Sequence, residues 1–150
     1  MGRQRGRSKF EFLLGIVIFG VLASMLLARL IGIEEEAART EIELTVRNMR
    51  VGLQLAVGER LMRGQEDRLV ELLAADPAQF LGWQPPGYAQ GNGNAAAPGS
   101  WRFDPAMREL AYRPRQPAAF DGRDLLKWRV AAQGVIGGRI VGIRLETLPN

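Results

Sequence analysis

The sequence predicts an α+β fold in which one long N-terminal helix packs against a small antiparallel β-sheet. Two patterns in the chain support this prediction. A charge-free apolar run near the N-terminus passes into a segment whose apolar residues recur at steps of three and four, which is helical spacing. The last third of the chain instead alternates apolar with polar residues, which is strand spacing. A chain of 150 residues has room for one membrane segment and one small domain.

The first half of the predicted helix is apolar enough to cross a membrane. Residues 12–28 carry no charge, and residues 30–33 extend the apolar character past Arg29. About 20 mostly apolar residues span the hydrocarbon core of a bilayer, so residues 10–33 are long enough, with Arg29 close enough to the end to reach the headgroups. A buried helix of a water-soluble domain is the alternative, but such a helix is rarely apolar all round.

The charges on either side of this run indicate its orientation. Basic side chains precede it (Arg3, Arg5, Arg7 and Lys9), and acidic ones follow it (Glu34, Glu35 and Glu36). Because basic residues stay on the cytoplasmic side, we expect a cytoplasmic N-terminus and residues 34–150 on the far side. A cleaved secretory signal would need a shorter apolar region that ends at a small-x-small site. Residues 23–25, Ala-Ser-Met, fit such a site poorly, which favours retention in the membrane.

One acidic side chain lies directly before the apolar run, at its N-terminal end. Glu11 directly precedes residues 12–28, and an acidic side chain at mid-bilayer costs about 2.5–3.5 kcal/mol on insertion scales. Glu11 either lies in the headgroup layer beside Lys9, where the cost is small, or pairs with a positive charge from another chain. The insertion cost alone does not separate these two interpretations.

The second half of the predicted helix is amphipathic. Apolar residues recur at helical steps along one stripe: Ile42, Val46, Met49, Leu53, Val57 and Leu61. No proline interrupts residues 10–63, and Gly64 is a suitable helix end, so we expect one continuous helix whose stripe covers a sheet. A parallel coiled coil is the alternative, but the heptad span is short.

Short elements and a loop follow this helix. Glu66 and Asp67 suit the start of a second, shorter helical element within residues 65–82, and the Asp76-Pro77 pair suits the start of another turn. Residues 82–100 are rich in glycine and proline, which predicts a surface loop.

The final third predicts four strands. Residues 101–104 and 109–113 alternate around a Pro-Ala turn, as a β-hairpin does. Residues 126–132 predict a third strand, and residues 139–147 a fourth in which Val141, Ile143 and Leu145 share one face. We expect the apolar face of this sheet to meet the helix stripe.

Composition argues against an enzyme. Histidine and cysteine are both absent, which removes the commonest general base, the thiol nucleophile and most transition-metal ligands. Carboxylate pairs such as Glu66 with Asp67, or Asp121 with Asp124, fit solvated helix starts and turns better than a glycosidase-like site. We therefore predict no catalytic residues, no cofactor and no metal site.

The basic balance does not by itself indicate nucleic acid. The net charge is +4, and it falls to +2 without residues 1–6. Eight arginines spread over the predicted sheet, interleaved with Trp101, Tyr112 and Trp128, are the pattern that a single-strand surface would use. Outward alternation above a buried face explains the same arginines, and nearby acidic residues dilute their field. We favour that explanation and do not expect a nucleic-acid partner.

The N-terminal spacing resembles that of type IV pilins and type II secretion pseudopilins. Gly6 ends a short basic leader, Glu11 stands five positions later, and Gly20 stands nine beyond Glu11, followed by Val-Leu-Ala. The resemblance implies cleavage between Gly6 and Arg7 by a prepilin peptidase, methylation at Arg7, and pairing of Glu11 with a neighbour's N-terminus. It also marks Glu11, Phe12 and Gly20 as assembly residues. Arg7 departs from the family pattern, which usually has Phe, so the leader is degenerate.

The resemblance implies a minor pilin or pseudopilin, with a pilin-like fold and other such subunits as partners. It implies a single-pass protein of the bacterial inner membrane, with its C-terminal domain in the periplasm or in a pilus or pseudopilus. The predicted organisation is a leader over residues 1–6, a transmembrane half over 7–33, an amphipathic half over 34–64 and an α+β domain over 65–150. The alternative is a stand-alone single-pass membrane protein with a small partner-binding extracytoplasmic domain.

Overall fold

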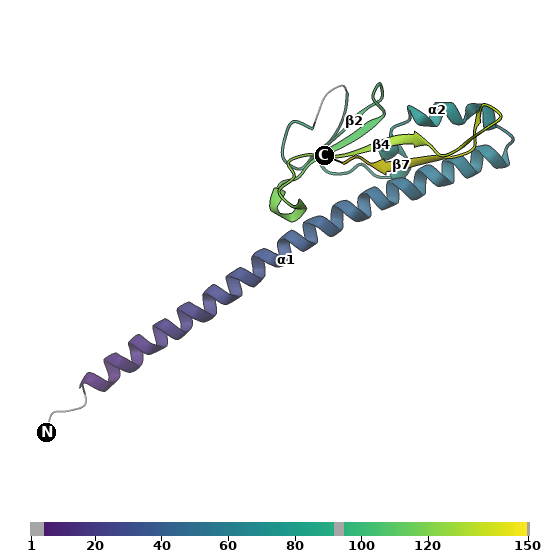
Figure 1. Cartoon of the computed structure of the whole chain (residues 1–150). Coiled ribbons are helices and arrows are strands. Elements are labelled where there is room, and N and C mark those ends of the chain that lie inside the picture. Colours follow the sequence, from purple (N-terminus) through teal and green to yellow (C-terminus); the bar gives the residue numbers. More distant parts are fainter. Residues whose placement is uncertain (1–4, 92–94, 150) are drawn as a thin grey trace. The chain divides into compact units, whose positions relative to one another are not determined.

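A computed structural model describes residues 5–91 and 95–149 (Figure 1). The chain forms two compact units, Met1–Ala38 and Arg39–Asn150. The first unit consists, in its described part, of the beginning of helix α1 (Arg5–Met62), and the second contains the rest of α1 and all other elements.

Helix α1 is 58 residues long, which confirms the prediction of one unbroken helix. Its end is fixed by Gly64, whose φ of 65° is accessible to glycine without steric cost. The amide of Gln65 donates to the Arg60 carbonyl at 2.9 Å, and the amide of Gly64 donates to the Leu61 carbonyl at 3.1 Å. This pair of bonds is the Schellman arrangement, which satisfies carbonyls that a helix end leaves free.

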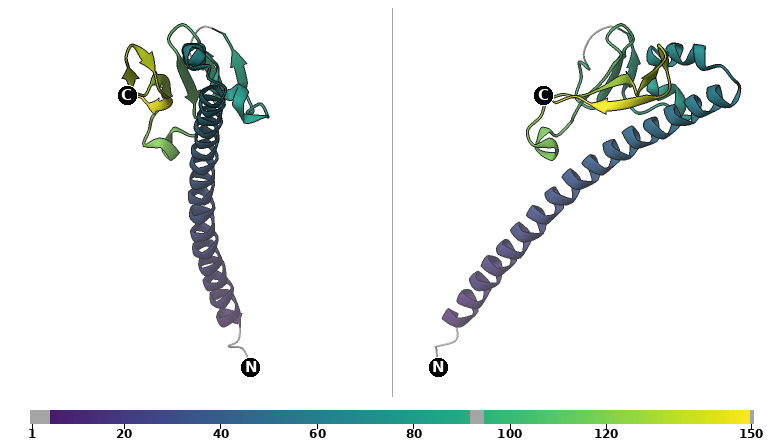
Figure 2. Two further views of the ribbon diagram at one scale, coloured as in Figure 1. Left: turned by 90° about the vertical axis from the view of Figure 1, so that its right-hand side faces the viewer. Right: turned by 45° about the vertical axis from the view of Figure 1, so that its right-hand side comes forward.

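The second unit is an α+β layout built on a five-stranded sheet of order β1-β2-β3-β4-β7. The strands are β1 (Tyr88–Gln90), β2 (Ser100–Asp104), β3 (Glu109–Arg113), β4 (Leu126–Ala132) and β7 (Ile143–Thr147). Neighbouring strands from β2 to β7 are antiparallel, as expected, and Trp101 pairs with Tyr112 in the β2–β3 register. Figure 2 shows this sheet lying beside the second part of α1.

The sheet differs from the prediction at one edge. Strand β1 pairs in parallel with β2, so the sheet is mixed rather than purely antiparallel. This strand lies inside residues 82–100, which we expected to form only a surface loop. The same segment buries Pro85 and Ala95. The composition concealed the strand because β1 has only three residues and each of them pairs with a residue thirteen positions away.

Short helices connect α1 to the sheet: η1 (Glu66–Arg68), α2 (Leu69–Leu73) and η2 (Pro77–Leu81), with η3 (Pro117–Phe120) following later. The Asp76 side chain accepts a hydrogen bond from the Ala78 amide at 2.9 Å and so caps η2, which confirms the expected start at Asp76-Pro77. Helix α2 contacts β4 and β7.

One hydrophobic core joins the α1 stripe, α2 and the inner face of the sheet. Five stripe residues are buried: Ile42, Val46, Met49, Leu53 and Val57. The prediction is wrong for the sixth, because Leu61 lies in the last turn of α1 and is 38% exposed.

The predicted fourth strand is divided. A separate two-stranded hairpin, β5 (Val135–Ile136) with β6 (Arg139–Ile140), precedes β7. The break lies at residues 141–142, where the Val141 amide donates to the Gly134 carbonyl and the Gly142 carbonyl accepts from the Gln133 amide. As a result Ile143 and Leu145 are buried while Val141 is exposed, so the expected shared face holds for only two of the three residues.

Candidate functional site

The residues marked by the pilin resemblance all lie on α1. Gly6 and Arg7 belong to its first turns, and their side-chain surroundings lie outside the described part of the structure. Glu11, Phe12 and Gly20 follow on the apolar half, where the Phe12 side chain is 72% exposed. The structure therefore places the three predicted assembly residues on one exposed stretch of helix.

This stretch is the one helix among the described residues that is long and apolar enough to cross a membrane. Every described side chain of residues 9–30 is exposed, including three phenylalanines. Exposed apolar surface on this scale marks an interaction with lipid or with another protein. A helix suits lipid because its backbone hydrogen bonds are satisfied within the segment.

Small residues line part of the apolar half. Gly20, Ser24 and Ala28 recur at steps of four, which places them on one face of the helix. A Cβ atom built at Gly15 or at Gly20 meets nothing within 4 Å. The Ser24 hydroxyl donates to the Gly20 carbonyl at 2.8 Å, so it needs no water. Small residues at this spacing allow two helices in lipid to approach closely.

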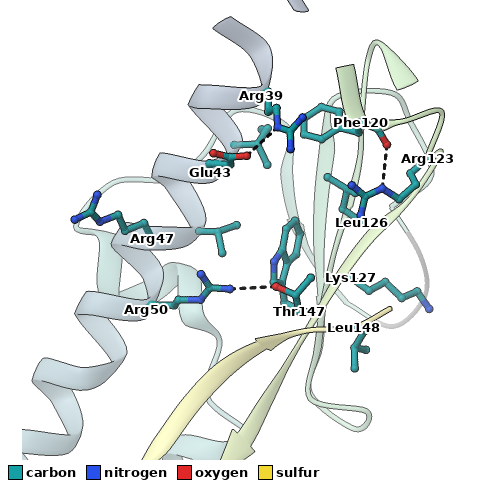
Figure 3. Close-up of a pocket in the computed structure, with 13 residues that line it drawn as sticks. Arg39, Glu43, Arg47, Arg50, Phe120, Arg123, Leu126, Lys127, Thr147 and Leu148 are labelled. Atoms are coloured by element: carbon teal, nitrogen blue, oxygen red, sulfur yellow. Dashed lines mark hydrogen bonds and ion pairs between the residues drawn. The ribbon is translucent and has the colours of Figure 1, made fainter. Parts of the chain in front are cut away.

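The second unit has a groove of about 530 Å³ between α1, η3 and the ends of β4 and β7 (Figure 3). Its floor is apolar and includes Val46, Leu126 and Trp128. Five cationic side chains and one acidic side chain line it: Arg39, Arg47, Arg50, Arg123 and Lys127, with Glu43. The arrangement suits a ligand or partner that is both apolar and acidic.

Most of these cations are engaged within the chain. Arg39 Nε lies 3.0 Å from Glu43 Oε1, and this hydrogen bond, with the charges of Glu43 and Asp121, raises the pKa of the Arg39 guanidinium. Arg123 pairs with Asp121 at 3.1 Å, and Lys127 lies 3.6 Å from a carboxylate oxygen of Glu109. These pairs reduce the positive field at the η3 side of the groove.

Arg50 and Arg47, unlike the other cations of the groove, have no ion pair with a described carboxylate. Arg50 donates from Nε to the Leu145 carbonyl at 3.0 Å and from a terminal nitrogen to Thr147 Oγ1 at 3.2 Å, both neutral acceptors (Figure 3). Arg47 extends away from the sheet, and it has no hydrogen-bond or ion-pair partner among the described residues. The charges of these two arginines are therefore not offset by a carboxylate within the part of the chain that the structure describes.

A second, polar cleft of about 500 Å³ lies beside η2 and β1. Its wall includes Trp83, which is 48% exposed, and Tyr88. The Tyr88 hydroxyl is buried near the Asp76 carboxylate without a hydrogen bond of normal geometry to the described residues. Burial first, and Asp76 second, raise the pKa of the Tyr88 phenol. The Asp76 carboxylate accepts hydrogen bonds from the Ala78 amide, as the cap of η2, and from the Gln90 side chain.

The aromatic rings of the sheet belong to the core. Trp101 stacks near Tyr112 and Trp128, with ring centroids 4.4 and 5.8 Å apart, and all three are buried. Arginines on the sheet make ion pairs, among them Arg129 with Glu109 and Arg144 with Glu146. The stacking rings and the arginines therefore do not form one exposed surface of the kind that binds single strands.

Among the described residues, no three His, Cys, Asp or Glu side chains lie together in a way that could hold a metal ion. Comparison of the chain with protein-family models, with curated proteins and with solved structures found no match in any of the three.

Sequence reasoning missed the groove. Its lining comes from residues 39–50 and residues 120–148, which are far apart in the chain and adjacent only after folding. A partial signal is present in the sequence, since Arg123 is one of the eight arginines in the last third, and Arg47 and Arg50 are three positions apart on a helix. Nothing in the sequence indicated that these two sets meet.

Proposed function

We propose that this chain is a minor pilin or pseudopilin. It is a non-enzymatic, membrane-anchored subunit that assembles through its N-terminal apolar helix into a type IV pilus or a type II secretion pseudopilus. One observation carries the proposal: Glu11 and Gly20 lie on the exposed stretch of α1, five and fourteen positions after Gly6, which is pilin spacing. Such a helix needs lipid or other copies of itself around it, and an assembling subunit uses first one and then the other.

Glu11 sets the axial register in this mechanism. In the membrane its carboxylate stands next to lipid, where an unpaired charge is costly. In the assembly it pairs with the N-terminal ammonium of a neighbouring copy, and the low dielectric of the packed helices strengthens that attraction. Sliding one helix by a single residue, about 1.5 Å, weakens the pair, so the carboxylate selects one alignment.

The apolar face supplies contact area for the same assembly. Gly15 and Gly20 leave open space where a second helix can approach, and Phe12 is a large exposed side chain beside Glu11. Close packing around small residues favours helix association where burial from water contributes nothing. Prepilin peptidase removes residues 1–6, and the subunit then resides in the bacterial inner membrane, with its C-terminal domain in the periplasm, until it is incorporated.

Replacing Glu11 by alanine tests the register. Glu11→Ala leaves insertion into membranes unchanged and reduces incorporation into sheared fibres or overexpressed pseudopili to background, because the register pair is lost. Membrane fractionation and immunoblotting of the fibre fraction measure both quantities. Glu66→Ala is the matched control, since Glu66 is exposed on η1 and lies outside the assembly helix. Wild-type incorporation of Glu11→Ala overturns the register role.

A stand-alone single-pass membrane protein is the second candidate, and Arg7 favours it, because Phe usually follows the cleavage site in pilins. Intact-mass measurement of the protein purified from membranes separates the two. Loss of residues 1–6, with or without an added methyl group, supports the subunit, whereas a permanent anchor keeps the full chain.

A further inference from the structure

Some charged side chains of α1 form ion pairs within the described chain and others do not. Arg39, Arg47 and Arg50 form a basic edge of the groove, called here the α1 rim. Arg39 is paired with Glu43, but Arg47 has no described partner and Arg50 bonds only neutral oxygens. Arg47 also points away from the sheet, toward whatever lies alongside the helix (Figure 3). Arg47 is therefore available to a second molecule, whereas Arg50 adds positive charge to the α1 rim while its guanidinium stays bonded to β7.

The acidic counterpart lies earlier on the same helix. Glu34, Glu35 and Glu36 follow the apolar run, and none of them has a hydrogen-bond or ion-pair partner among the described residues. Glu34 and Glu36 are exposed. Arg39, which stands four positions after Glu35, is already paired with Glu43. Residues 34–36 therefore keep a net negative charge that a neighbouring cationic surface attracts.

We propose that the acidic triplet of residues 34–36 in a second copy docks on the α1 rim. The contact rests on the proposed function, because it needs parallel copies held side by side by their apolar halves. Within one copy the pairing is impossible: Glu35 and Arg47 are twelve positions apart, which is about 18 Å along a helix. Two parallel copies displaced by that length bring the triplet of one beside Arg47 of the other.

This displacement is compatible with the register set by Glu11. Pairing of Glu11 with the N-terminus at Arg7 displaces neighbouring copies by four positions, or about 6 Å. Twelve positions are three such steps, so the proposed contact is made by the copy three displacements along and not by the copy whose N-terminus pairs with Glu11. Ala37 and Ala38, which follow the triplet, are small and let a second helix come close to the rim. The two unmatched charge clusters of α1 therefore neutralise each other along a fibre.

Disulfide cross-linking tests the contact with little background, because the chain has no cysteine. Two differently tagged copies, one with Glu35→Cys and one with Arg47→Cys, are co-expressed, and fibres are sheared and mildly oxidised. A disulfide needs Cα atoms about 4.4–6.8 Å apart, so a heterodimer reports contact between copies and not within one. Asn48→Cys is the matched control, since Asn48 is the next residue, is exposed and does not line the groove.

The proposal expects a Glu35→Cys to Arg47→Cys heterodimer in the fibre fraction, with little from the Asn48→Cys control. Reversing the charge of Arg47 and Arg50 to glutamate lowers incorporation about tenfold, and a partner with Glu34, Glu35 and Glu36 reversed to lysine restores it. Fibres that form normally without this heterodimer, or with equal cross-linking at Asn48, overturn the contact while leaving the proposed function in place. Fibres that never contain the wild-type chain overturn both. Loss of binding to anionic vesicles on charge reversal, with no heterodimer in the fibre fraction, assigns the α1 rim to lipid and also overturns the contact between copies.

Discussion

The two halves of α1 are one continuous helix with opposite relations to their surroundings. In residues 9–30 every described side chain is exposed although nearly all are apolar, whereas the stripe from Ile42 to Val57 is buried against the sheet. The same backbone geometry serves both halves. The difference is that the second half has a folded partner within its own chain and the described part of the first half has none.

This contrast separates local from tertiary stabilisation. The second half packs against the sheet on one side only. Its apolar residues therefore form one stripe, and polar residues occupy the other faces. In the first half apolar residues occupy all faces, which is the composition of a helix that lipid or other helices surround. A change on one half should therefore affect folding and leave insertion alone, and a change on the other half should do the reverse.

The largest effect is expected from the buried stripe. Leu53→Ala removes a side chain that is 0% exposed and lowers the unfolding free energy by about 2–5 kcal/mol, because it leaves a cavity in the core. Leu55→Ala, two residues away and 70% exposed, changes it by less than about 0.5 kcal/mol. Urea unfolding of the full chain in detergent measures both, and equal losses would contradict the division of α1.

A charge in the apolar half comes next. Ile18→Arg raises the insertion free energy by about 2.5–3.5 kcal/mol, because the guanidinium enters the middle of the apolar run. Val51→Arg places the same charge on an exposed position of the second half, and we expect insertion to stay at the wild-type level. A glycosylation-based insertion assay quantifies the two variants, and unchanged insertion of Ile18→Arg would argue against a membrane segment.

The smallest effect concerns a close approach within the second unit. A Cβ atom at Gly52 would lie 2.6 Å from Phe80 Cβ and 2.7 Å from the Phe80 carbonyl oxygen. Gly52→Ala therefore costs about 1–3 kcal/mol of unfolding free energy through overpacking. Gly58→Ala meets nothing within 4 Å and gains about 0.5–1 kcal/mol from helix propensity. Thermal unfolding of the two variants should shift in opposite directions, and a shared direction would contradict the packing of η2 on α1.

Local patterns predicted the regular elements well. Proline-free helical spacing gave α1 to within a residue of its end, and alternation located β2, β3 and β4. Patterns failed where pairing is not local. Strand β1 is parallel to β2 and too short to alternate visibly. The final strand is divided at residues 141–142, where the backbone bonds residues 133 and 134.

The candidate site divides in the same way. Glu11, Phe12 and Gly20 are found from spacing along one helix, since each residue's place follows from its number. The groove cannot be found from spacing, because Arg50 bonds Leu145 and Thr147, which are 95 and 97 positions away in the chain. Its floor, Val46 with Trp128, exists only when the helix stripe meets the sheet.

The sequence alone determined that this protein has a long helix with an apolar first half, an amphipathic second half and a strand-rich C-terminal third. These properties depend on the periodicity of side chains along the backbone, which is a local quantity. The tertiary structure alone decided the mixed sheet, the exposure of Leu61 and Val141, and which arginines of α1 lack a carboxylate partner. Those depend on distances between residues remote in sequence, which periodicity does not encode.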